Sequence, residues 1–136
     1  MKDEVFTLEF DGGSRGNPGP AGIGCVVRAA DGTPLLTLGR YIGTATNNVA
    51  EYTALIIGLE EARRHGVEDL EIRMDSKLVV EQMNGKWKMK AAHLRPLFLE
   101  AGALLASFPK RLIRHIPREQ NTIADALANR AIDEAK

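Results

Sequence analysis

The sequence predicts an α/β fold in which helices flank a five-stranded mixed sheet, with elements in the order βββαβααβα. Two observations carry this prediction. The first 42 residues alternate apolar and polar side chains with a period of two, broken by a glycine-rich turn and an Asp-Gly turn, which indicates three antiparallel strands. After residue 46, helical apolar patterns alternate with two short strand patterns, which is typical of parallel strands joined by helical crossovers.

The predicted elements follow one another with short connections. Strands are expected at 5–10, 21–28, 34–42, 70–75 and 111–116. The first helix is expected to be capped by Asn47 or Asn48 and to end near Gly66, with a core-facing stripe of Ala54, Leu55, Gly58, Leu59 and Ala62. Ser76 is expected to cap a short helix to about residue 84, and a third helix covers 94–108. Asn121 is expected to cap the last helix, whose inward side chains are Ala124, Leu127, Ala128 and Ala131.

Composition limits the kind of protein that this chain can be. With 136 residues, 44% apolar and 26% charged, the chain is long enough for one domain, residues 1–136, with a packed core. It has no apolar signal segment and no run of 18 apolar residues, and the lone Cys25 excludes an intrachain disulfide, so we expect a cytoplasmic protein. The net charge is zero, yet eight basic residues and one acid lie between 86 and 118, which predicts one cationic region.

Two aspartates follow the first and fourth strand patterns on the polar face. Asp11 comes directly after 5–10 and precedes a glycine turn, and Asp75 closes 70–75 with the same parity. Because a helical crossover makes these strands parallel neighbours, we expect the strand ends to lie only about 5 Å apart. Two like charges so close together are costly without a cation. Taken singly, Asp11 also fits a turn aspartate and Asp75 an acid at a helix N-terminus.

Two further acids belong to helices. Glu51 lies 4, 7 and 11 residues before Leu55, Gly58 and Ala62, on or beside the core-facing stripe, where an acid without a partner is rare. It also fits a residue that flanks the stripe or the helix start. Asp125 lies in the first turn of the last helix, where it also complements the helix dipole. Together the four acids predict an oxygen-ligand site for Mg²⁺, and two such ions predict phosphodiester hydrolysis.

Four motifs give the chain a resemblance to a known family. They are Phe-Asp-Gly-Gly-Ser-Arg-Gly-Asn-Pro-Gly-Pro-Ala-Gly at 10–22, Thr-Asn-Asn-Val-Ala-Glu-Tyr at 46–52, Met-Asp-Ser at 74–76 and Arg-Glu-Gln-Asn-Thr-Ile-Ala-Asp-Ala-Leu-Ala at 118–128. On these motifs the chain resembles type 1 ribonuclease H nearly from end to end. The resemblance implies a ribonuclease H-like fold and cleavage of the RNA strand of RNA/DNA hybrids, with two Mg²⁺ or Mn²⁺ ions, to 5′-phosphate and 3′-hydroxyl ends. Carried over by motif, the catalytic and metal-binding acids are Asp11, Glu51, Asp75 and Asp125.

The resemblance also implies positions that contact the hybrid. Small residues leave room for the ribose, and side-chain amide groups form hydrogen bonds with its 2′-hydroxyl. The positions that match the family's RNA contacts are Gly12, Gly13, Asn17 and Asn48. Thr46 resembles the position that holds a DNA-strand phosphate. Sugar and phosphate contacts are further expected from Lys77, Lys86, Trp87 and Lys88. Two structural alternatives remain open, a simple hairpin turn at 16–19 and a Trp87 that closes the edge of the core.

Two features differ from longer members of that family. The inserted basic helix-loop that grips the hybrid is absent, because Lys90 runs through Ala91-Ala92 directly into the next helix. This compact form predicts weaker or differently distributed substrate binding. Arg118 is expected to be the auxiliary group near the acids, with His115 as the alternative, because 112–116 resembles a strand and leaves little loop for a mobile histidine.

Three functions are therefore compared. The first is hydrolysis of RNA in RNA/DNA hybrids, the second is a related nuclease that also cleaves double-stranded RNA, and the third is a non-catalytic hybrid-binding module. The four acids favour the first. We expect a monomer whose partner is the RNA/DNA hybrid, with no membrane association and no obligate protein partner.

Overall fold

The computed structural model describes residues 4–135, so residues 1–3, on which part of the signal-segment prediction rests, lie outside the described residues. Within that range, five strands form one sheet of order β3-β2-β1-β4-β5. β1 (Phe6–Ser14), β2 (Gly19–Arg28) and β3 (Pro34–Ala45) are antiparallel neighbours. β4 (Asp69–Met74) runs parallel to β1, and β5 (Lys110–His115) runs parallel to β4. The predicted mixed sheet is confirmed.

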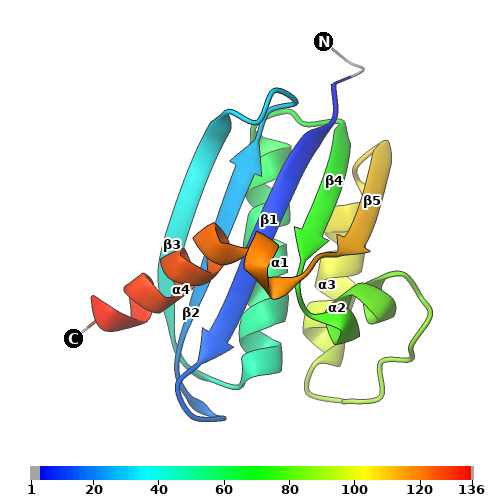
Figure 1. The fold of residues 1–136 in the computed structure, drawn as a ribbon. Helices are drawn as coiled ribbons and strands as arrows, with labels where there is room; N and C mark the ends of the chain where they lie inside the picture. Colours follow the sequence, from blue (N-terminus) through cyan, green and yellow to red (C-terminus); the bar gives the residue numbers. More distant parts are fainter. Residues whose placement is uncertain (1–3, 136) are drawn as a thin grey trace.

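Helices cover both faces of this sheet (Figure 1). α1 (Asn47–Arg64) and α3 (Arg95–Ala106) lie behind it in that view, and α4 (Thr122–Asp133) crosses its front. α2 (Lys77–Met83) follows β4, and the short 3-10 turn η1 (Arg118–Gln120) connects β5 to α4. No helix in residues 4–135 combines the length and the apolar character needed to span a bilayer.

The main core lies between the sheet and α1. Apolar side chains of β1 and β4, such as Leu8, Phe10 and Ile72, are fully buried against Leu55 and Leu59 of α1. This confirms the predicted faces of both strands and the predicted stripe of α1. The polar residues of β1 and β4 therefore point to the opposite face, the one that α4 crosses.

Two local predictions, the end of β1 and the N-cap of α1, were wrong. β1 continues through Gly12 and Gly13, which pair with Ile23 and Gly22 of β2, so Asp11 lies inside a strand and not at its end. The glycines keep an extended backbone because they pair with residues of β2. The N-cap of α1 is Thr46, whose Oγ1 accepts from the Val49 backbone N–H at 3.2 Å, in place of Asn47 or Asn48.

α4 packs directly on glycines of β2, and this places the last acid. A Cβ at Gly24 would lie 2.1 Å from the backbone oxygen of Ala124, and a Cβ at Gly22 would lie 2.5 Å from that of Ala128. A helix approaches a sheet this closely only where side chains are missing. The buried residues of α4 are Ala124, Ala128 and Ile132, so the prediction missed Ile132, while Leu127 and Ala131 are only partly buried.

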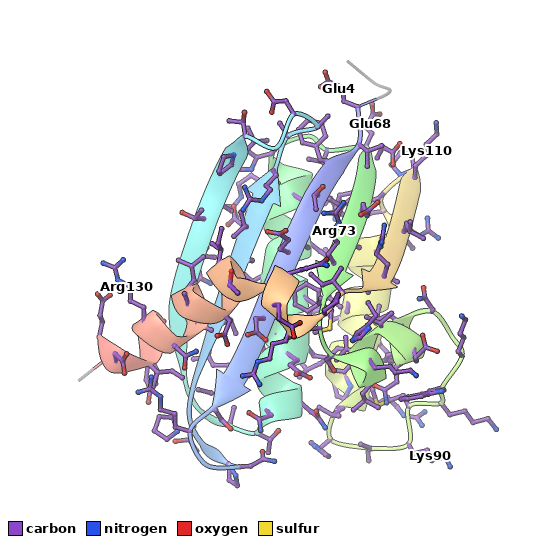
Figure 2. The ribbon with its side chains drawn as sticks, in the orientation of Figure 1. Glu4, Glu68, Arg73, Lys90, Lys110 and Arg130 are labelled. Carbon is purple, nitrogen blue, oxygen red and sulfur yellow. The ribbon has the colours of Figure 1, made fainter. Side chains whose placement is uncertain are left out.

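The predicted single cationic region is divided in space. Lys90, in the connection between α2 and α3, and Lys110, at the start of β5, lie at opposite ends of the molecule (Figure 2). The separation arises because β5 runs parallel to β4, which carries Lys110 to one end of the sheet and His115 to the other.

Candidate active site

The four acids singled out in the sequence line one cavity of about 390 Å³, and they are Asp11, Glu51, Asp75 and Asp125. Sheet register explains the first pair. Glu9 of β1 pairs with Arg73 of β4. Asp11 lies two residues further along β1, and Asp75 is the residue directly after β4, so both lie just beyond the paired stretch. α1 supplies Glu51 from behind the sheet, and the first turn of α4 supplies Asp125 from the front. Elements from both layers thus meet at this cavity.

Asp11 is the most perturbed of these acids. Its pKa is raised from 3.8 to about 8, mainly by burial, then by a hydrogen bond with Asp125 and by the negative charges of the other acids. Its Oδ1 accepts from the Gly12 backbone N–H at 3.0 Å, which fixes the carboxylate beside the strand. Near neutral pH and without a cation, Asp11 therefore holds a proton.

Glu51 reaches the cavity from a helix that touches β1 backbone to backbone. A Cβ at Gly12 would lie 2.2 Å from the backbone oxygen of Ala50 and 2.7 Å from the backbone nitrogen of Glu51. Burial raises the pKa of Glu51 to about 7, and a hydrogen bond with Ser76 opposes that rise. The missing side chain at residue 12 thus sets the separation between Asp11 and Glu51.

Asp75 and Asp125 are held through side-chain amides. The Nδ2 of Asn121 lies 3.4 Å from Asp75 Oδ1, and that of Asn129 lies 3.3 Å from Asp125 Oδ1. Asn129, one turn further along α4, also donates to the backbone oxygen of Asp125 at 3.0 Å.

The donor set suits a hard divalent cation. Four carboxylates supply only oxygen ligands, and burial, followed by the neighbouring acids, raises the pKa of Asp11. In the described residues no three His, Cys, Asp or Glu side chains form a ready cation cage. Mg²⁺ itself typically keeps several waters and takes some of its ligands from a phosphate. The residues fit Mg²⁺ or Mn²⁺ better than zinc, which prefers nitrogen and sulfur.

Comparison with known proteins bears directly on this site. Residues 9–131 match the family model described as Reverse transcriptase-like. The ribonuclease HI of Halobacterium salinarum is 49% identical over 93% of this chain and 63% of its own length. The crystal structure of RNase H1 from the same archaeon superposes with a TM-score of 0.94 at 47% identity, over 96% of this chain and 99% of that one. The chain belongs to the type 1 ribonuclease H family.

Two further relatives extend the comparison. Bifunctional protein Rv2228c of Mycobacterium tuberculosis is 52% identical over 94% of this ribonuclease H chain, which spans only 35% of that relative's length. LC11-RNase H1, solved in complex with an RNA/DNA hybrid, superposes with a TM-score of 0.91 at 44% identity, over 96% of this chain and 98% of that one.

The two candidates for the auxiliary group of this ribonuclease H chain lie in different places. Arg118, in η1, lines the cavity with the four acids. His115 is not found among the described residues that line it, and its Nε2 lies 3.2 Å from the backbone oxygen of Asp75. Arg118 is thus the cationic group that faces the acids from the β5 side.

Several polar residues of the cavity wall were not predicted as site residues, namely Ser14, Arg15, Asn47 and Asn129. Arg15 forms an ion pair with Asp133 at 2.5 Å and donates to the backbone oxygen of Asn129 at 3.3 Å. It thereby connects the β1–β2 turn to α4. The alternation of side chains along a strand, which located Asp11 and Asp75, gives no prediction for a residue in a turn such as Arg15. Asn129 could have been found, because residues four apart on a helix, here Asp125 and Asn129, lie side by side.

The expected RNA-contacting residues fall into two groups. Gly13 lines the cavity, and a Cβ there would meet only Asn47 Oδ1, at 3.8 Å, so this position leaves open space for a ligand. Gly12 also lines the cavity, but its missing side chain faces α1.

The polar residues expected to contact the hybrid are partly engaged within the fold. Asn17 accepts the Asn47 backbone N–H at 3.0 Å, and Thr46 caps α1 through its hydroxyl. Asn48 lies half-buried in the first turn of α1. The polar ends of Asn17 and Thr46 therefore also stabilise the turn and the helix start.

The expected sugar and phosphate contacts lie apart from the acids. Trp87 is 44% exposed, and the Lys77 ammonium lies 6.0 Å from the centre of its ring. Trp87 and Lys88 line a second hollow of about 400 Å³ together with Arg95. Lys86 is exposed beside Trp87 in the same connection. This surface is cationic with one open aromatic ring, the combination that binds nucleic-acid backbones.

Proposed function

We propose that this chain is an endoribonuclease that hydrolyses the RNA strand of RNA/DNA hybrids, leaving 5′-phosphate and 3′-hydroxyl ends. One observation carries the proposal, the meeting of four carboxylates from β1, α1, the end of β4 and α4 in a single cavity. The complex of LC11-RNase H1 with an RNA/DNA hybrid supports the choice of substrate.

The four acids would hold two Mg²⁺ or Mn²⁺ ions, which when bound stabilise the attacking and leaving oxygens of an in-line displacement at phosphorus. The chain's own residues prepare the site for this. Asp11 keeps a proton near neutral pH and gives it up as cations bind, because burial and the neighbouring charges raise its pKa to about 8. Arg118 adds a permanent positive charge beside the acids, suited to the 5′-phosphate that the reaction forms.

Substrate recognition follows from the two surfaces. Gly13 leaves room beside the acids for the RNA backbone, since a side chain there would meet nothing closer than 3.8 Å. Trp87 presents an open ring for a DNA sugar, and Lys77 and Lys88 place ammonium groups near it for phosphates. An RNA strand at the acids and a DNA strand at Trp87 would explain a preference for hybrids.

The direct test is Asp75→Asn, assayed on an end-labelled RNA/DNA hybrid with Mg²⁺. Asparagine keeps the shape but removes one ligand charge, so we expect cleavage to fall by at least about 10³-fold while the thermal transition stays near that of the parent chain. Asp69→Asn is the matched control, because Asp69 begins the same strand at its other end. Full activity in Asp75→Asn would exclude the mechanism.

A second assay separates the alternative functions. RNA/DNA, RNA/RNA and duplexes with a single ribonucleotide are each incubated with Mg²⁺ and with Mn²⁺. We expect cleavage of the hybrid alone. Cleavage of RNA/RNA at a comparable rate would widen the substrate class, and metal-independent binding of the hybrid without cleavage would identify a binding module.

A further inference from the structure

Asn121 is a buried polar residue whose side chain does not serve the helix that it begins. It is only 2% exposed and occupies the N-cap position of α4, yet it makes no side-chain hydrogen bond to that helix. An N-cap asparagine normally turns its Oδ1 toward the first free backbone N–H groups of the helix. Here Oδ1 is buried without a hydrogen-bond partner among the described residues.

The amide is turned so that its nitrogen serves other elements. Nδ2 donates to the backbone oxygen of Phe10 at 2.9 Å and approaches Asp75 Oδ1 at 3.4 Å. Both neighbours are acceptors, so the opposite orientation would place Oδ1 against two oxygens. The two donated bonds, and not helix capping, therefore explain why this residue is an asparagine.

The backbone of the same residue holds a third element. The carbonyl oxygen of Asn121 accepts the backbone N–H of Asp125 at 3.1 Å in the first turn of α4. Phe10 is the residue directly before Asp11. One residue thus contacts the backbone that carries Asp11, the carboxylate of Asp75 and the turn that carries Asp125. Glu51 is held separately, by α1.

We propose that Asn121 is a positioning residue that sets the spacing of Asp11, Asp75 and Asp125 and thereby the affinity of the site for divalent cations. The inference rests on the proposed function, because the acids are taken as the metal ligands. The amide makes no contact with the open part of the cavity, so it acts on metal binding and not on binding of the hybrid. Partners of metal ligands typically change metal affinity by about 10- to 100-fold when they are removed.

The test is Asn121→Ala, with Mg²⁺ binding measured by the rise of the thermal transition as Mg²⁺ is titrated, and with cleavage measured alongside. We expect the Mg²⁺ concentration for half-maximal effect to rise at least about tenfold in both assays, with the KM for the hybrid unchanged. Gln82→Met is the control. Gln82 is also a buried amide, 6% exposed, accepts from the Tyr52 hydroxyl at 2.6 Å, and does not line the cavity of the acids. This variant should lose stability without any change in Mg²⁺ dependence.

The outcomes separate the inference from the proposed function. An Asn121→Ala protein that loses stability but keeps the parent Mg²⁺ dependence would overturn the inference, whether or not the parent chain cleaves hybrids. A parent chain that binds Mg²⁺ without cleaving would overturn only the function. If Asn121→Ala does not fold, the side-chain NH₂ signal of Asn121 in the parent chain decides. This NMR signal should shift as Mg²⁺ is added. If it stays constant while the backbone amide signals of the site residues shift, the inference is refuted.

Discussion

Gly12→Ala is expected to damage both stability and turnover, although it adds a single methyl group. The new Cβ would lie 2.2 Å from the backbone oxygen of Ala50 and 2.3 Å from its carbonyl carbon. An ordinary carbon-to-oxygen contact is about 3.4 Å, so β1 and α1 must separate by about 1 Å. These are backbone atoms, and no side-chain rotation relieves the overlap.

The overlap occurs between the two elements that carry Asp11 and Glu51. Asp11 precedes Gly12 in β1, and Glu51 follows Ala50 in α1, so the displacement falls between two of the four acids. Misplacement of catalytic groups by about 1 Å costs roughly 10²-fold in rate. Forcing a methyl group into a packed interface costs about 1–3 kcal/mol. At about 4 °C per kcal/mol for a chain of this size, the thermal transition should fall by roughly 4–12 °C.

Gly13→Ala is the matched comparison. Its new Cβ would meet only Asn47 Oδ1, at 3.8 Å, which is an ordinary contact. We expect its thermal transition to stay close to that of the parent and its kcat to be nearly unchanged, with a higher KM for the hybrid because Gly13 borders the cavity. Thermal denaturation and steady-state kinetics on a labelled hybrid measure both variants. A Gly12→Ala protein with parental stability and kcat would refute the close approach of β1 and α1.

Three further predictions use other parts of the site. Gly24→Ala should lower the free energy of unfolding by about 1–3 kcal/mol, because its Cβ would lie 2.1 Å from a backbone oxygen of α4. Gly102→Ala is the control and should not lower it, because its Cβ would have no atom within 4 Å. Equal thermal transitions of the two variants would contradict this prediction. Because the pKa of folded Asp11 is about 8 against an ordinary 3.8, the metal-free fold holds a proton that the unfolded chain releases. The contribution of Asp11 to the free energy of unfolding should be fully present below about pH 4 and should be lost as the pH rises to about 8. A free energy of unfolding that does not change with pH in this range, measured in the presence of a chelator, would contradict this prediction. Arg118→Ala should reduce turnover of the hybrid more than His115→Ala, because only Arg118 lines the cavity; near-normal turnover in Arg118→Ala would reverse that assignment.

The pairing of Asp11 with Asp75 was predictable from the sequence because it depends on two regular rules. Side-chain parity assigns each aspartate to a face of its strand, and a helical crossover makes the strands parallel neighbours. β1 and β4 are parallel neighbours in the structure, and Asp11 and Asp75 line one cavity, as these rules require. The helical spacing that placed Glu51 beside the stripe of α1 is equally regular.

The sequence was less informative where a residue serves a distant element. Gly12 resembles a turn residue, because nothing local indicates that the backbone of α1 will pass within contact distance of it. Asn121 resembles a helix cap, because its acceptors on Phe10 and Asp75 are remote in sequence. Asn47 or Asn48 was predicted as the cap of α1 and Thr46 was not considered, because adjacent capping residues of similar propensity cannot be ranked by pattern alone.

Asp11 is positioned by three contacts of different kinds, and each has its own experimental signature. The register with β4 sets its level relative to Asp75, the backbone approach at Gly12 sets its distance from Glu51, and the Asn121 amide ties the preceding residue to α4. Loss of the second contact should lower kcat and stability, because it moves Glu51 away from Asp11 while Asn121 still contacts the elements that carry Asp11, Asp75 and Asp125. Loss of the third should raise the Mg²⁺ requirement while the spacing of Asp11 and Glu51 persists. Because both contacts act on the residues beside Asp11, the effects of Gly12→Ala and Asn121→Ala on stability should depart from additivity.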